Sequence, residues 1–386
     1  MRRSLAALLA ATGLALVACQ DATVPSPDSP NFAQGAAAAD RYIVVFQDDV
    51  TDVPGLARSL AAAHSSTPDF VYQHALKGFA AVLSDRAVAA LEADPRVSYV
   101  ERDQPVYVVA QTLPWGIDRI DADISSTKAG DGTGAVTNVN VYIIDTGADA
   151  KHTDLNVVNH VNFAGGPNRD CHGHGTHVAG TVAAKDNDQD VVGVVPGAPI
   201  TGVKVLNCGG SGTTSGVIKG VDWVTANAAK PAVANMSLGG GASQSLDDAV
   251  KNSANSGVFY AIAAGNSGDD ACNYSPARAG THDGVMTLAA TDQNDQEPSW
   301  SNFGNCVDLW APGVSILSTK KGGGTTTLSG TSMASPHGAG TGALYLSSST
   351  GASPATVENQ LKTDAVSTGT TSKDGRAIKL VYAGNY

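Results

Sequence analysis

The sequence has little charge and no excess of basic residues. Only 16% of its 386 residues are charged, and Lys and Arg together number 24 against 36 Asp and Glu. The formal net charge of −12 argues against a nucleic acid partner, because phosphate binding requires a basic face. Apolar residues make up 42% of the chain, which excludes a disordered protein. The length allows two domains with a large core.

Long apolar runs are also scarce. The one long run opens the chain as MRRSLAALLAATGLALVAC, where two arginines precede an Ala/Leu segment too short for a stable membrane anchor. This pattern predicts an export signal over residues 1–19. Its last four residues, LVAC, resemble the lipoprotein box, which favours acylation of Cys19 over an ordinary signal peptide with an incidental cysteine. We therefore expect a secreted protein whose precursor is tethered to the membrane through Cys19.

Cysteine is rare, with five in the whole chain. Export leads to an oxidising compartment, so the four cysteines beyond the signal are expected to form disulfides. Cys171, Cys208, Cys272 and Cys306 allow three pairings, and their spacing alone does not decide among them.

The chain divides by composition into a linker and two folded parts. Residues 20–39 are rich in Pro, Ser and Ala without periodicity, which predicts a linker. Residues 40–110 predict a small α+β domain. Its expected strands are 42–46, 76–84 and a pair within 97–109, and its expected helices are 53–64 and 86–95.

Residues 111–386 have a different pattern, in which short continuous apolar runs alternate with helical segments. The apolar runs are 139–145, 200–206, 232–238, 257–264 and 284–290, and the helical segments include 215–229 and 244–257. Continuous apolar strands alternating with helices predict an α/β fold with a doubly wound, mostly parallel sheet covered on both faces. In such sheets the chemistry is found at the carboxyl ends of the strands.

Four polar residues near the ends of the predicted strands and the starts of the predicted helices are candidate catalytic residues. Asp145 ends an apolar run, His174 precedes a helix of small residues, and Ser332 lies in a glycine-rich turn before another helix. A serine nucleophile needs a base to take its proton, and the base needs a carboxylate to hold its tautomer. Asn266 follows a further strand and could donate its amide to an oxyanion together with the Ser332 N–H.

Two other enzyme classes have weaker support. The stretch RDCHGHGTHVAG places His172, His174 and His177 close together, as in a zinc site, but no H-E-x-x-H spacing occurs and no glutamate is nearby. Asp145-Thr146-Gly147 also matches the aspartic protease motif. That mechanism needs a second such carboxylate, and no second D-T-G or D-S-G is present.

Three motifs, IIDTG, GHGTHVAGT and SGTSMASPH in this order, resemble the subtilisin superfamily, the subtilases. The segments PWGIDRI, GVDWV, YSPARA and SNFGNCVDLWAPG resemble its proteinase K branch and the aqualysin-like members. The resemblance covers residues from about 115 onward and implies a subtilisin-like serine endopeptidase. It implies that Asp145 orients His174, which is base and then acid, that Ser332 attacks, and that Asn266 holds the oxyanion. His172 and His177 are then scaffold residues.

The resemblance also bears on maturation and disulfides. It implies the pairs Cys171–Cys208 and Cys272–Cys306, and it identifies residues 40–110 as a ferredoxin-like inhibitor and folding prodomain. We expect an autoprocessed zymogen, cut between Val108 and Thr112, that gives a soluble monomer. Its partners would be protein and peptide substrates and its own prodomain. The non-enzyme alternative is a catalytically silent relative that only binds, which self-cleavage would distinguish.

The same resemblance implies which residues contact the substrate and where a calcium ion binds. Two segments resemble the strands that bind an extended peptide, and a third borders the first specificity pocket: the residues are Gly210, Ser211, Gly212, Ser237, Leu238, Gly239, Ala264 and Gly265. The absence of acidic residues there predicts a preference for aliphatic or aromatic P1 side chains. A structural calcium is expected at Asp308 with backbone oxygens around Val285, although the neighbouring segment ARAGTHDGVMT is longer than in the relatives.

Overall fold

The computed structural model describes residues 40–103 and 111–386, and the chain divides into the units Met1–Tyr107 and Val108–Tyr386. The predicted signal peptide with Cys19, the linker 20–39 and most of the predicted processing segment lie outside the described residues. In the described part of the chain, no helix is both long and apolar enough to cross a membrane.

The small unit is a four-stranded antiparallel sheet with two helices. Its elements are β1 (Arg41–Phe46), α1 (Val53–Ala63), β2 (Phe70–Tyr72), β3 (Gly78–Val82), α2 (Asp85–Glu92) and β4 (Val97–Arg102), with the sheet order β2-β3-β1-β4. This βαββαβ order is the ferredoxin-like arrangement. Asp52 and Ser84 cap the two helices by accepting hydrogen bonds from the N–H groups of Gly55 and Ala87.

The large unit is built on a nine-stranded sheet of order β16-β17-β13-β12-β10-β8-β5-β7-β6. All of its strand pairs are parallel except β16 with β17. The strands are β5 (Asn140–Asp145), β6 (Val157–Asn162), β7 (Ile200–Lys204), β8 (Ala232–Met236), β10 (Val258–Ala263), β12 (Val285–Thr291), β13 (Leu309–Pro312), β16 (Val366–Thr371) and β17 (Ala377–Leu380). The prediction of a doubly wound, mostly parallel sheet is confirmed.

The helices and the small hairpins complete the large unit. The helices are α3 (Trp115–Arg119), α4 (His174–Ala183), α5 (Thr214–Asn227), α6 (Gln244–Asn255), α7 (Thr331–Ser348) and α8 (Pro354–Asp364), with short 3-10 turns at Ala122–Ile124, Ala271–Asn273 and Ala277–Thr281. Strand β9 (Gly240–Gly241) pairs with β11 (Tyr274–Ser275), and β14 (Ile316–Thr319) pairs with β15 (Thr325–Leu328).

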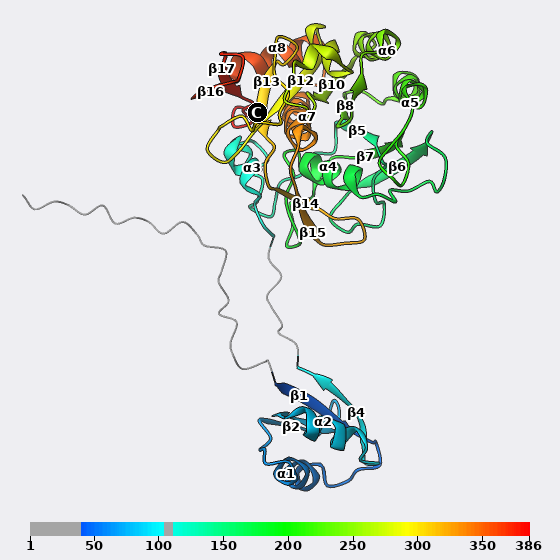
Figure 1. Ribbon diagram of the computed structural model, residues 1–386, viewed down its shortest axis with the longest axis vertical. Helices are drawn as coiled ribbons and strands as arrows, with labels where there is room; N and C mark the ends of the chain where they lie inside the picture. Colours follow the sequence, from blue (N-terminus) through cyan, green and yellow to red (C-terminus); the bar gives the residue numbers. More distant parts are fainter. Residues whose placement is uncertain (1–39, 104–110) are drawn as a thin grey trace, which may run out of the picture. The chain divides into compact units, whose positions relative to one another are not determined.

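Alternate side chains of the large sheet point into two separate cores. On β5, Val141 and Ile143 pack in the core that contains residues of α4, α7 and α8. Tyr142 and Ile144 pack in the other core, against residues of α5 and α6. Figure 1 shows α4 and α7 together over the middle of the sheet and α5 and α6 at its other side. The continuous apolar runs in the sequence thus reflect burial on both faces.

Candidate active site

Asp145 is the last residue of β5, a strand flanked in the sheet by β7 and β8. Its side chain is fully buried, and its Oδ1 accepts a hydrogen bond of 2.6 Å from the Thr146 N–H. Gly147 follows with a φ of +105°, which a side chain would strain. The strand end therefore fixes the carboxylate in one position beneath the helix that begins at His174.

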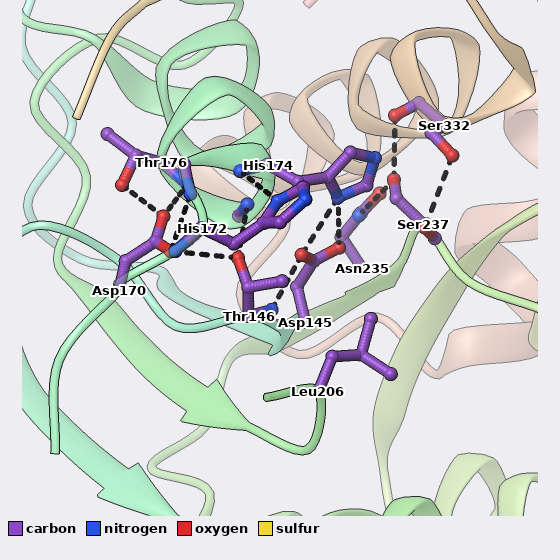
Figure 2. Close-up of polar contacts among 12 residues, drawn as sticks. Asp145, Thr146, Asp170, His172, His174, Thr176, Leu206, Asn235, Ser237 and Ser332 are labelled. Atoms are coloured by element: carbon purple, nitrogen blue, oxygen red, sulfur yellow. Dashed lines mark hydrogen bonds and ion pairs between the residues drawn. The ribbon is translucent and has the colours of Figure 1, made fainter. Parts of the chain in front are cut away.

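His174 is the first residue of α4, after Gly173 with a φ of +114°. Its Nδ1 lies 2.8 Å from Asp145 Oδ1 and 2.9 Å from Oδ2, as Figure 2 shows. Burial disfavours the charged imidazolium, but the Asp145 carboxylate outweighs this and raises the pKa of His174 above its usual value. The contact through Nδ1 leaves Nε2 as the nitrogen that can exchange a proton with substrate or nucleophile.

Ser332 is the second residue of α7, at a helix N-terminus where free N–H groups favour negative charge. Its hydroxyl donates to the Ser237 carbonyl oxygen at 3.2 Å rather than to His174, and the Ser237 hydroxyl donates to the Ser332 carbonyl oxygen at 2.7 Å (Figure 2). Ser237 also borders the hollow that contains His174. In free enzymes the hydrogen bond from nucleophile to base is often long or misaligned and tightens when substrate binds.

Asn266 lies after β10, and its side-chain carbonyl is held in place by Thr331. Its Oδ1 accepts from the Thr331 N–H at 2.9 Å and from the Thr331 hydroxyl at 2.8 Å. A Cβ built on Gly330 would be 3.3 Å from Asn266 Nδ2 and 3.6 Å from the Ser332 nitrogen. Both nitrogens therefore lie close to one point beside Gly330.

The residues predicted to bind substrate line two hollows beside these groups. The larger hollow is lined by the segments 209–214 and 237–241 together with His172 and His174. The second is lined by 238–241 and 263–267 with Thr331 and Ser332, and it has a volume of about 350 Å³. Gly210, Ser211, Gly212, Ser237, Leu238 and Gly239 border the first, and Ala264 and Gly265 the second. No Asp, Glu, Lys or Arg is found among the described residues that line either hollow.

The other two histidines of the stretch RDCHGHGTHVAG have different surroundings. His177 is fully buried, and its Nε2 lies 3.0 Å from the Ile316 carbonyl oxygen and 3.1 Å from that of Thr326. Burial lowers the pKa of His177 to about 4. His172 borders the larger hollow, and its Nδ1 accepts from the His174 N–H at 3.3 Å. Within residues 40–103 and 111–386, no three His, Cys, Asp or Glu side chains group to hold a metal.

Asp170 is a structural carboxylate that the sequence analysis did not identify. Its buried side chain accepts from the N–H groups of His172 (2.9 Å), Gly173 (2.8 Å) and Thr176 (2.9 Å), and from the hydroxyls of Thr176 (2.5 Å) and Thr146 (3.0 Å). It therefore joins the segment after Asp145 to the turn that begins α4. Its position shortly before a helix start is the available signal in the sequence, because Asp caps orphan N–H groups.

Lys204, at the end of β7, is a second residue that the sequence analysis did not single out. It is fully buried, and its ammonium donates to the carbonyl oxygens of Thr146 (3.0 Å) and Leu206 (2.7 Å). Burial lowers its pKa. A lysine inside the apolar run ITGVKVL is the signal that could have found it, because a buried charge needs specific partners.

Two disulfides are present, Cys171–Cys208 with a Cα separation of 4.9 Å and Cys272–Cys306 with one of 5.3 Å. This is the pairing that the family resemblance implies. The first ties the turn before His174 to the loop after β7, so it joins the start of α4 to one edge of the larger hollow.

The predicted calcium ligands have other partners. One oxygen of the Asp308 carboxylate lies 2.6 Å from Lys362 Nζ, and the other accepts from the Thr287 N–H at 2.7 Å. Calcium binds six to eight oxygen ligands, and an ammonium beside Asp308 supplies none. With an ammonium against one oxygen and a backbone N–H on the other, the Asp308 carboxylate does not fit a calcium ion.

The large unit thus combines a buried carboxylate–imidazole pair with a serine at a helix N-terminus, the groups that a serine hydrolase uses. The subtilase family profile matches residues 137–379, and the profile of peptidase inhibitor I9 matches residues 41–108. The chain therefore belongs to the subtilase family. It is a subtilisin-like serine protease, made as a zymogen with an inhibitor prodomain.

Individual relatives agree with this assignment. The chain is 43% identical over 374 residues to alkaline serine exoprotease A of Vibrio alginolyticus, covering 90% of this chain and 68% of the relative. It is 42% identical over 353 residues to the extracellular serine proteinase of Thermus sp., covering 83% of each. A crystal structure of a cold adapted subtilisin-like serine proteinase matches with a TM-score of 0.61 and 43% identity, covering 70% of this chain and 97% of that one. The predicted family and enzyme class are confirmed.

Proposed function

We propose that Asp145, His174 and Ser332 form the catalytic triad of a secreted endopeptidase. The observation that carries the proposal is the contact between His174 Nδ1 and the fully buried Asp145 carboxylate. This contact selects the tautomer in which Nε2 can accept a proton. The same unit contains Ser332 at the N-terminus of α7, and the Ser332 carbonyl oxygen accepts a hydrogen bond from the Ser237 hydroxyl.

The chemistry then proceeds through an acyl-enzyme. The Ser332 hydroxyl attacks the scissile carbonyl carbon while His174 takes its proton, and the resulting oxyanion accepts from Asn266 Nδ2 and the Ser332 N–H. His174 next gives the proton to the leaving amine as the C–N bond breaks. A water molecule, deprotonated by His174, hydrolyses the ester and restores the serine.

An extended substrate would lie between the segments 210–212 and 237–239, as an added strand. The absence of charged side chains around both hollows supports a broad preference for aliphatic and aromatic P1 residues.

We expect peptide esters with leucine or phenylalanine at P1 to be hydrolysed with kcat/KM at least about 10-fold above that for arginine, because an unpaired guanidinium is costly to desolvate. Steady-state kinetics on the three matched esters would measure this. A preference for the arginine ester would overturn it.

We propose the domain bounds 1–19, 20–39, 40–110 and 111–386 for signal, linker, prodomain and peptidase. Processing between Val108 and Thr112 would release a soluble, monomeric peptidase that acts on proteins and peptides, with no nucleic acid partner. The match to peptidase inhibitor I9 supports the prodomain as an intramolecular inhibitor.

We further propose that Cys19 is lipidated and that maturation frees the peptidase from the membrane. The sequence LVAC at the end of the apolar run supports the first part, and the extracellular assignment of relatives supports export. We expect the precursor in the membrane fraction of cells and the mature peptidase in the medium, with Cys19→Ser moving the precursor out of the membrane fraction. Fractionation followed by immunoblotting measures both. A precursor that is soluble before the substitution contradicts the tether.

A further inference from the structure

Two buried carboxylates converge on one lysine at the place where the family resemblance puts a calcium ion. The side chain of Asp308 is 8% exposed and that of Glu358 is 5% exposed, and Lys362 contacts an oxygen of each. The other Glu358 oxygen accepts from the N–H of Gly284, the residue before Val285. The ammonium thus lies directly against Asp308, and Glu358 connects it to the residue before Val285.

The contacts join three elements that are distant in the sequence. Asp308 immediately precedes β13, its second oxygen holds the N–H of Thr287 in β12, and Lys362 and Glu358 lie one turn apart on α8. A cation at this point links the two strands to the helix.

The charge balance explains why a cation is required. Two carboxylates buried close together repel each other, and each loses its hydration. One ammonium beside an oxygen of each carboxylate partly compensates the pair, and unlike a bound ion it cannot dissociate from the protein. A divalent ion at the same place would lie against the lysine, where like charges repel.

We propose that the Lys362 ammonium replaces the calcium ion at this site and makes the junction of β12, β13 and α8 independent of metal. The remainder of the chain can still bind calcium elsewhere, so a total dependence on calcium does not test the proposal. The test must isolate Asp308 and Lys362.

The experiment uses the full-length chain with Ser332→Ala in every variant, so that self-digestion does not interfere. Lys362→Met keeps most of the side-chain volume and removes the charge, and Lys219→Met is the matched control, because Lys219 pairs with Asp222 on the exposed surface. Thermal unfolding is followed by circular dichroism in EDTA and in millimolar calcium. The number of tightly bound calcium ions is counted by equilibrium dialysis for the parent and for Asp308→Asn.

Lys362→Met is expected to lower Tm in EDTA by about 5–10 °C, because it leaves two buried carboxylates without their counter-charge. Lys219→Met is expected to change Tm by less than about 2 °C, as for an exposed pair. Calcium should restore part of the loss in Lys362→Met, and Asp308→Asn should leave the parent's calcium count unchanged.

Three results would overturn the proposal. If Asp308→Asn binds one calcium fewer than the parent, Asp308 is a calcium ligand and the lysine does not replace the ion. If Lys362→Met matches Lys219→Met in EDTA, the ammonium has no structural role. If calcium raises the Tm of Lys362→Met by no more than it raises the Tm of the parent, the ammonium and the ion are not equivalent at this site. The Lys362→Met readings decide the question even if Asp308→Asn does not fold.

Discussion

Replacing Ser332 with alanine is expected to lower kcat by about 10⁶-fold, because removing the nucleophile of a Ser-His-Asp triad disables the unit as a whole. The same variant should remain a full-length precursor, since cutting between Val108 and Thr112 requires the same serine. Intact mass of the purified protein measures the processing, and hydrolysis of a P1-phenylalanine ester, after an unrelated protease has removed the prodomain, measures kcat. The residual rate reflects binding and the oxyanion donors alone.

Ser348→Ala is the matched control for this variant. Ser348 lies at the other end of the same helix, is exposed and donates only to the Tyr345 carbonyl oxygen. It should be processed and active like the parent. If Ser332→Ala were trimmed like the parent, the cut would come from another protease. If it also retained ester hydrolysis, the assignment of the nucleophile would be wrong.

The strands that carry the site could be predicted because each is buried on both faces and therefore has a continuous apolar sequence. The run 139–145 was predicted as a strand, and β5 covers Asn140–Asp145. Strand β2 was not predicted. It has only three residues, Phe70–Tyr72, and its side chains are half-buried or exposed, so its sequence has no clear period. Its extended conformation depends on the antiparallel pairing with β3.

The parts of the site that sequence reasoning did not find depend on contacts between distant segments. Lys362 belongs to a helix with polar neighbours, a pattern that is typical of a solvated face. Only the fold brings it to Asp308. Lys204 shows the opposite case. A lysine in an otherwise apolar buried strand was visible in the sequence, but its carbonyl partners at Thr146 and Leu206 are defined by the turns after the strands.

Asp145→Asn is expected to lower kcat/KM by about 10⁴-fold at neutral pH, because an amide favours the wrong tautomer of His174. The substitution should also move the pH dependence. The Asp145 carboxylate keeps the pKa of His174 above 6.5 against the effect of burial, and His174 must be neutral to accept a proton. In the parent, kcat/KM therefore rises with pH through that raised pKa and is lost as pH falls below it.

Without the Asp145 carboxylate, burial is opposed only by the smaller effect of the Asp170 charge, so the pKa of His174 falls and the acid limb of the Asp145→Asn profile should lie at lower pH than that of the parent. Profiles of kcat/KM against pH on one peptide ester test this, with the variants processed by an unrelated protease. Asp188→Asn, at an exposed aspartate, is the control and should match the parent in rate and profile. A limb that does not move would show that the buried carboxylate orients the imidazole without tuning its charge. A rate within a few-fold of the parent would remove Asp145 from the triad.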